Sequence, residues 1–257
     1  MKKTKYGIQM YSVRDLTDVS LRDALEKVAG LGYEYIEFAG FFDNSAEDVK
    51  SWLSEFGLIC SGTHTGIDAI APENIEETIK YHQEIGCKNI IVPGCDWSTL
   101  EKCDQIIDTF NFAQKKLAEY GIRLGYHNHS QEFFPNSYGK VIEDEIISRT
   151  SIELEIDTFW LYNAGIDVVS YLEEHKDRIS VIHLKDGTAS PAENKNYDMV
   201  HAGVLGYSLG EGSAPVEQIR EWALKNDILM VVESEDLNPS GIEEVKRCID
   251  FLRTLEG

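Results

Sequence analysis

The sequence contains no C-x-x-C pair, and it has an odd number of cysteines: Cys60, Cys87, Cys95, Cys103 and Cys248. A disulfide framework or a thiolate zinc site needs paired or closely spaced cysteines, so we expect neither and infer a reducing compartment. No run of 18 apolar residues is present, so no membrane-spanning helix is expected. The basic segment MKKTKYGIQMYSVRD is followed by no apolar stretch of the kind a signal peptide has. These absences predict a cytoplasmic protein.

Basic residues are also scarce. The 24 Lys and Arg stand against 45 Asp and Glu, a formal net charge of −21 at pH 7. A nucleic-acid-binding protein needs basic side chains to neutralise phosphates, and an anionic membrane surface would repel this charge, so we expect neither partner. A small neutral sugar or a metal cation is compatible with such a field. We expect most of these acids to be solvated helix surface.

Short apolar runs alternate with segments of helical periodicity along the whole chain. In the 20–30 segment apolar residues recur at helical spacing, Gly32 follows, and the apolar run Tyr35–Ala39 comes next. This order repeats, and each run is followed by a helical segment, the last of them Ile242–Leu255. The eight expected strands are Ile8–Ser12, Tyr35–Ala39, Leu58–Thr63, Ile90–Pro93, Arg123–His127, Ile152–Asp157, Val181–Lys185 and Leu229–Glu233. Strands that alternate with helices indicate a parallel sheet with crossover connections.

Eight such units in 257 residues are typical of a (β/α)8 TIM barrel. The competing fold is an open doubly wound sheet, which would place a G-x-G-x-x-G turn after its first strand. This chain has Tyr11-Ser12-Val13-Arg14-Asp15 there, so we favour an α/β protein with one TIM-barrel domain over residues 1–257. The long connection Asp186–Pro215 after the seventh strand is of a length typical of lids and binding loops.

Ionisable residues collect at the carboxyl ends of the expected strands, where TIM barrels have their active sites. They are Glu37, His64, His127, His129, Glu132, Asp157, His183, Lys185, Glu233 and Glu235. Asp157, His183 and Glu233 can each donate one ligand atom into the barrel mouth, and a fourth ligand must come from the fifth strand. Oxygen-rich ligation with one imidazole suits Mn²⁺, Mg²⁺ or Co²⁺, and Zn²⁺ is compatible with it.

The alternation of side chains along a strand also predicts which charged side chains lie on the same face. Lys185 lies one pleat beyond His183 and could polarise a substrate oxygen, or it could serve as a structural cation paired with Asp186 or Glu155. The acids Glu153, Glu155 and Asp157 alternate along the sixth strand. At least one of them must be paired inside the barrel, because an unpaired buried charge is costly.

Seven segments carry a resemblance that spans nearly the whole chain. They are GIQMYSVRD, YIEFAG, GIRLGYHNHSQEF, LEIDTFW, VIHLKDG, LGEG and VVESED. Together they resemble the sugar phosphate isomerase/epimerase family of xylose-isomerase-like TIM barrels, related to keto-sugar 3-epimerases, inosose dehydratase and endonuclease IV. The pair YHNHxxEF and HLKD is fairly specific for the family, but not for one substrate.

The resemblance implies a metal site. Asp157, His183 and Glu233 match family metal ligands. The epimerases have a Glu at the end of strand five, where this chain has His127, so we expect the nearby Glu132 as the fourth ligand. His127 and His129 are then substrate contacts or alternative ligands.

The resemblance also bears on the partners. Trp160 stands where the endonuclease and epimerase branches carry a His, which argues against a trinuclear zinc cluster. Family barrels often pair into dimers or tetramers, so a homo-oligomer is an expectation.

The chemistry that follows is proton abstraction next to a carbonyl by a divalent-metal-dependent sugar isomerase or epimerase acting on a keto-sugar or sugar derivative. Glu132 and Glu233 would carry the proton, and Lys185 would polarise an oxygen. Two other functions stay open: a metal-dependent lyase of the inosose dehydratase or 3-keto-glycoside-cleaving type, and a catalytically inactive sugar-binding barrel. The residues expected to contact the sugar or finish the pocket are Gln9, Tyr11, Glu37, Phe41, His64, Trp97, His127, His129, Phe133 and Trp160.

Overall fold

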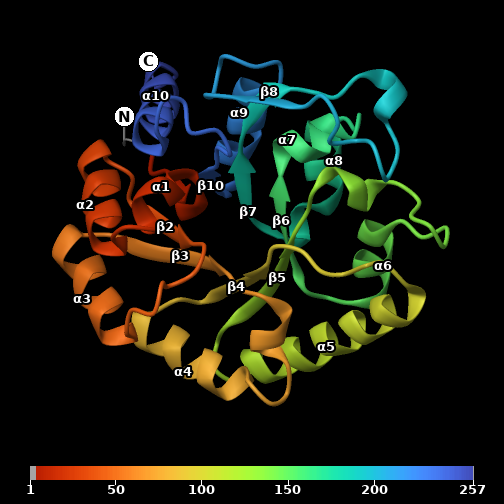
Figure 1. Cartoon of the computed structure of the whole chain (residues 1–257), viewed down its shortest axis with the longest axis horizontal. Helices are drawn as coiled ribbons and strands as arrows, with labels where there is room; N and C mark the ends of the chain where they lie inside the picture. The colour runs from red at the N-terminus through yellow and green to blue at the C-terminus, as the bar shows by residue number, and fades with distance from the viewer. Residues whose placement is uncertain (1–3, 257) are drawn as a thin grey trace.

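Helices surround a ring of strands (Figure 1). The computed structural model describes residues 4–256, and within them eight parallel strands close into a barrel in the order β1-β10-β7-β6-β5-β4-β3-β2. The barrel strands are β1 (Gly7–Gln9), β2 (Tyr35–Phe38), β3 (Ile59–His64), β4 (Asn89–Val92), β5 (Arg123–His127), β6 (Glu153–Asp157), β7 (Ile179–Leu184) and β10 (Leu229–Val232). β1 pairs with both β2 and β10, which closes the ring. The predicted (β/α)8 barrel is confirmed.

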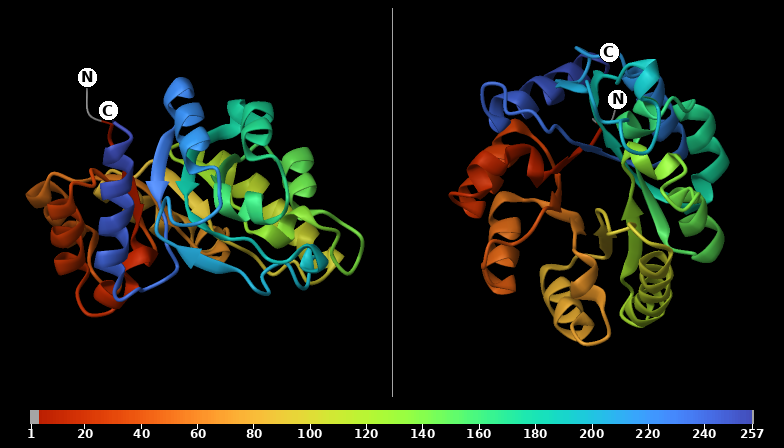
Figure 2. Two further views of the ribbon diagram at one scale, coloured as in Figure 1. Left: turned by 90° about the horizontal axis from the view of Figure 1, so that it is seen from above. Right: turned by 45° about the vertical axis from the view of Figure 1, so that its right-hand side comes forward.

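The helices pack their apolar faces against the outside of this ring (Figures 1 and 2). They are α1 (Arg14–Thr17), α2 (Leu21–Leu31), α3 (Ala46–Phe56), α4 (Ile75–Ile85), α5 (Leu100–Ala118), α6 (Ile142–Arg149), α7 (Thr158–Asn163), α8 (Val168–His175), α9 (Val216–Asn226) and α10 (Gly241–Thr254). Helix α2 ends at a left-handed glycine, Gly32, whose φ is 90°, a conformation that glycine adopts without steric cost. Among residues 4–256, no helix is long and apolar enough to cross a membrane.

The predicted strands lie within a few residues of the observed ones, and the largest difference has a local cause. We expected the first strand over Ile8–Ser12, but β1 ends at Gln9. The Gln9 side chain accepts a hydrogen bond from the backbone N–H of Tyr11 at 3.0 Å, which starts the 3-10 turn Met10–Val13. This side-chain cap turns the chain out of the sheet three residues early.

The long connection after β7 lies across one end of the barrel (Figure 2) and contains a small hairpin. Its two strands, β8 (Asp186–Thr188) and β9 (Leu205–Tyr207), pair antiparallel. The Asp186 carboxylate accepts hydrogen bonds from four backbone N–H groups, at 2.8–3.0 Å: those of Gly187, Gly210, Gly212 and Ala214. Asp186 therefore ties the beginning of the connection to its end.

One buried acid outside the barrel mouth makes the stability of the fold depend on pH. Burial raises the pKa of Glu143 on α6 to about 7, although its carboxylate accepts a hydrogen bond from the Tyr171 hydroxyl at 2.6 Å. Because the folded-state pKa of Glu143 lies above the unfolded value of about 4.5, its protonated form stabilises the fold. This stabilisation is fully present below about pH 4.5 and is lost as the pH rises through 7. A shift of this size corresponds to about 3 kcal/mol.

We therefore expect Glu143→Gln, which does not titrate, to unfold with nearly wild-type free energy at pH 5 and with up to about 3 kcal/mol more than wild type at pH 8. Urea unfolding at both pH values measures this difference. The exposed Glu174→Gln on α8 is the matched control and should follow wild type. A difference between Glu143→Gln and wild type that does not change with pH would contradict the assignment.

Candidate active site

The side chain of Asp157 is held at the C-terminal end of β6 by its place between a strand and a helix. Asp157 is both the last residue of β6 and the N-cap of α7, where its Oδ1 accepts the backbone N–H groups of Phe159 and Trp160 at 2.9 Å. Its own N–H donates to Asn128 Oδ1 at 3.0 Å, which joins the ends of β5 and β6. In the sheet register Asp157 lies opposite His183 on β7. These constraints hold the second oxygen, Oδ2, toward the barrel interior.

Four side chains at these strand ends can hold one metal ion. His127, Asp157, His183 and Glu233 each offer a ligand atom, and these atoms lie within 4.8 Å of one another. All four residues are buried. Ligands about 2.1 Å from a shared cation stand about 3–4 Å apart, so the spacing fits one divalent ion.

The state of Asp157 supports this fit. Its Oδ2 is buried without a hydrogen-bond partner, and burial raises the pKa of Asp157 to about 8. A carboxylate oxygen without a partner is costly to bury, and a cation bound to it removes that cost. The donor set of two imidazoles and two carboxylates suits Mn²⁺, Co²⁺ or Zn²⁺, and Mg²⁺ less well.

A second set of ligand atoms, from His64, His127, Glu155 and His183, shares two residues with the first. At its centre the Oε1 atom of Glu155 lies 2.8 Å from His64 Nε2, 3.1 Å from His183 Nε2 and 3.3 Å from His127 Nδ1. Burial raises the pKa of Glu155, but the charge of His183 and the close imidazoles of His127 and His64 outweigh it and hold the pKa well below its ordinary value. Glu155 is thus the acid of the sixth strand that is paired inside the barrel, as the alternation required.

Gln9 and Glu37 lie beneath the site. Glu37 Oε1 accepts a hydrogen bond from Gln9 Nε2 at 2.6 Å and lies 2.8 Å from His183 Nε2. The other imidazole nitrogen, His183 Nδ1, lies 3.2 Å from Glu233 Oε2. Both Gln9 and Glu37 are fully buried, so they orient His183. Neither lines the cavity described below, and the expectation that they contact the sugar stays a prediction.

Lys185 lies behind this group as a buried cation. Its Nζ forms an ion pair with Glu235 and lies 3.8 Å from Glu233 Oε2 and 3.9 Å from Asp157 Oδ2. It also stands 4.3 Å from the centre of the Trp160 ring. Burial lowers the pKa of Lys185, but the three carboxylates outweigh it and raise the pKa above its ordinary value. Lys185 is therefore an ammonium ion.

The structural partners expected for Lys185 were Asp186 and Glu155, and both are engaged elsewhere: Asp186 by the backbone of the long connection and Glu155 by the histidines. The observed partner, Glu235, was placed among the ionisable strand-end residues by the sequence, but was given no role there. The signal was present, because Glu233 and Glu235 share one face of their segment.

Glu132, expected as the fourth metal ligand, lies in neither group of ligand atoms. It belongs to the 3-10 turn Ser130–Phe133, where its carboxylate accepts the backbone N–H of His129 at 2.9 Å and the Tyr126 hydroxyl at 3.1 Å. Burial raises the pKa of Glu132 to about 7. This turn holds the carboxylate in place, so the ligand atom that β5 brings to the group is that of His127.

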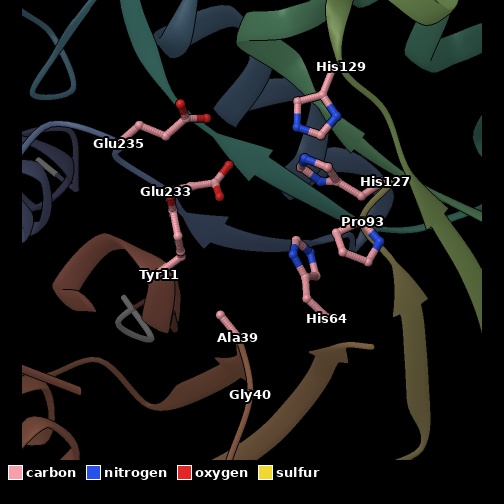
Figure 3. A pocket seen from close by; sticks show the side chains of 9 residues that line it. All are labelled: Tyr11, Ala39, Gly40, His64, Pro93, His127, His129, Glu233 and Glu235. Carbon is pink, nitrogen blue, oxygen red and sulfur yellow. The ribbon is translucent and has the colours of Figure 1, made fainter. Parts of the chain in front are cut away.

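A cavity of about 440 Å³ opens above these residues (Figure 3). Three histidines face Glu233, Glu235 and Tyr11 across it. Its lining residues are Tyr11, Ala39, Gly40, His64, Pro93, His127, His129, Glu233 and Glu235. Four of the residues expected to contact the sugar or finish the pocket therefore line this cavity: Tyr11, His64, His127 and His129.

The other expected pocket residues lie elsewhere. Phe41 lines a neighbouring cavity. Trp97 donates a hydrogen bond to the Tyr126 hydroxyl within the core, and Phe133 packs against Tyr171. Trp160 is buried beside Lys185, and its ring packs against His201 of the long connection at 4.8 Å. His201, which the sequence did not single out, also contacts Gln131 and so joins the connection to the turn after β5.

Comparisons with known proteins agree with this architecture. The family model described as xylose isomerase-like TIM barrel matches residues 25–255. An inosose dehydratase of Geobacillus kaustophilus is 25% identical over 194 residues, which cover 63% of this chain and 60% of that protein. A 2-oxo-tetronate isomerase of Haemophilus influenzae is 25% identical over 173 residues, which cover 57% of this chain and 66% of that protein. The chain thus matches less than two thirds of the length of these two relatives.

Among solved structures, a sugar phosphate isomerase/epimerase from Parabacteroides distasonis superposes with a TM-score of 0.78. It is 24% identical and covers 98% of each chain. At this identity the likeness shows the fold.

Metal titration distinguishes the two candidates for the fourth ligand. We expect chelator-treated wild type to bind one Mn²⁺ by calorimetry, and His127→Ala or Asp157→Ala to bind it at least about 100-fold more weakly, since loss of even an outer partner costs 10–100-fold. Glu132→Gln should bind within about threefold of wild type and serves as the matched control. Weak binding by Glu132→Gln together with normal binding by His127→Ala would reverse the assignment.

Proposed function

Because the chain belongs to the xylose isomerase-like TIM barrel family, we propose that it is a divalent-metal-dependent sugar isomerase or epimerase that abstracts a proton next to a carbonyl. One observation carries the proposal: His127, Asp157, His183 and Glu233 form a buried group with metal-ligand spacing at the floor of a cavity of sugar size. Two of the relatives bear the names of an isomerase and a dehydratase, which is compatible with this proposal.

Glu233 has the position and protonation state of the base. Burial raises its pKa, but the charges of Lys185 and His183 outweigh it and hold the pKa of Glu233 well below its ordinary value. The contacts to Lys185 and His183 use Oε2, and Glu233 lines the cavity. Its Oε1 is therefore the atom we assign to accept the proton. The chemistry that a divalent cation supplies when bound here is stabilisation of negative charge on the carbonyl oxygen.

The return of the proton decides between isomerisation and epimerisation. For isomerisation Glu233 suffices for the carbon-bound proton, because the same carboxyl group can deliver it to the neighbouring carbon, while the proton of the neighbouring hydroxyl must pass to the former carbonyl oxygen. Epimerisation needs a second group on the opposite face, where His127 and His129 line the cavity (Figure 3). Burial holds the pKa of His129 well below its ordinary value, so its imidazole is neutral and must first take up a proton before it can return one to this face. Glu132, which accepts the His129 backbone N–H, positions this side of the cavity in our proposal.

The proposal predicts deuterium exchange. With Mn²⁺ in D₂O, a panel of ketoses should take up deuterium at the carbon next to the carbonyl without loss of water, as followed by NMR and mass spectrometry. Glu233→Gln should lower kcat by about 10²–10⁴-fold, the usual contribution of a general base. The exposed Glu217→Gln on α9 is the matched control. Exchange that survives Glu233→Gln would exclude Glu233 as the base.

A dehydratase is the second candidate, favoured by the inosose dehydratase among the relatives. The same base would abstract the same proton, and a β-hydroxyl would then leave as water. Including an inosose in the panel distinguishes the two: a dehydrated product would replace the isomerase proposal with this one.

A further inference from the structure

A second cavity, of about 510 Å³, adjoins the first. Gly40 and His64 line both cavities, so the two meet at the ends of β2 and β3. The second cavity extends from there over the 3-10 turn Ile67–Ile70 and along α4. The proposed reaction uses no residue of this extension.

The walls of the second cavity combine flat apolar surface with acceptors for hydroxyl groups. Phe41 and Tyr81 stand with ring centres 4.2 Å apart, and Asp68, Asn74 and Glu77 are exposed along the rim. A sugar ring has an apolar face of C–H groups and a periphery of hydroxyl donors, which match aromatic rings and carboxylates respectively.

The same walls disfavour a phosphorylated ligand. Among the described residues that line the two cavities there is no Lys or Arg, whereas Asp68 and Glu77 add negative charge. Phosphate recognition uses Arg, Lys or a helix N-terminus directed at the anion. The cation that lines both cavities, His64, is already paired with Glu37 and Glu155 through its Nε2, at 3.1 and 2.8 Å. A dianionic phosphate placed here would therefore meet the carboxylates of Asp68 and Glu77 without a free cation among the described lining residues to bind it.

The walls are also held in place before any ligand binds. The Tyr81 hydroxyl donates to the Asn44 carbonyl at 2.8 Å, and Asn74 Nδ2 donates to the Asp68 carbonyl at 2.8 Å. A site with fixed walls loses little conformational entropy on binding.

We propose that this second cavity is a subsite for a further neutral sugar ring, so that the substrates are glycosylated keto-sugars rather than sugar phosphates. The inference rests on the proposed function, because it places the reacting ketose in the first cavity. The glycosyl substituent then passes His64 and lies against Phe41 and Tyr81.

The test compares ketoses that differ only in their substituent: D-fructose, its glucosyl derivatives maltulose and isomaltulose, and D-fructose 6-phosphate. With the Mn²⁺-loaded enzyme in D₂O, we expect kcat/KM for exchange to be at least tenfold higher for one of the disaccharides than for D-fructose, and lowest for the phosphate. Equal values for fructose and both disaccharides, or a preference for the phosphate, would overturn the proposal.

Two variants locate the effect. Ala69 is half-buried in the wall of the second cavity, so the larger side chain of Ala69→Phe would fill that cavity. We expect Ala69→Phe to lower kcat/KM for the preferred disaccharide at least tenfold more than kcat/KM for D-fructose. Glu77→Gln should lower the ratio of kcat/KM for the disaccharide to kcat/KM for D-fructose three- to tenfold. The exposed Ala118→Phe on α5 and Glu73→Gln before α4 are the matched controls. Equal losses on both classes of substrate in Ala69→Phe would also overturn the proposal.

Calorimetric binding to Glu233→Gln separates this inference from the proposed function. Tighter binding of a disaccharide than of D-fructose, abolished by adding Ala69→Phe, supports the subsite even if wild type exchanges no proton, a result that would contradict only the proposed function. Exchange without any disaccharide preference, in turn, contradicts the subsite and leaves the proposed function standing.

Discussion

The barrel mouth depends on the balance of buried charge. Three buried carboxylates, Glu37, Glu155 and Glu233, lie 2.8–3.2 Å from His183. A fourth, Asp157, lies 3.9 Å from the buried ammonium of Lys185, which is also 3.8 Å from Glu233. Carboxylates removed from water are costly unless they are paired. Two devices reduce the cost here: imidazoles placed between the carboxylates, and a raised pKa at Asp157, which burial brings to about 8. A divalent cation would replace the remaining protons, because metal ligands must be deprotonated to bind.

This balance also explains the division of labour among the histidines. His183 is held on both sides, by Glu37 at Nε2 and by Glu233 at Nδ1. Burial lowers its pKa, but the charges of Glu155, Glu37 and Glu233 outweigh it and raise the pKa well above its ordinary value. Without a metal, His183 is therefore a cation that neutralises the carboxylates; with a metal bound to one nitrogen, Glu37 orients the ring through the other.

Strand–helix alternation made the barrel and three of its site residues predictable. Asp157, His183 and Glu233 follow apolar runs, and parallel strands must bring their carboxyl ends to one face. Spacing left open whether Glu132 or His127 groups with these three residues, because the grouping depends on the hydrogen bonds that hold Glu132 in its 3-10 turn. The pairing of Lys185 with Glu235 depends on the register between β7 and β10. That register cannot be predicted from the sequence of either strand alone.

The proposed site requires two imidazoles at one metal ion. Electron spin echo spectroscopy of the Mn²⁺-loaded protein measures the number of coordinated histidine nitrogens directly. With ¹⁵N-labelled histidine, we predict the modulation of two coordinated histidine nitrogens, one of them lost in His127→Ala. The modulation of a single histidine that persists unchanged in His127→Ala would contradict the account, because the ligand from β5 would then not be His127.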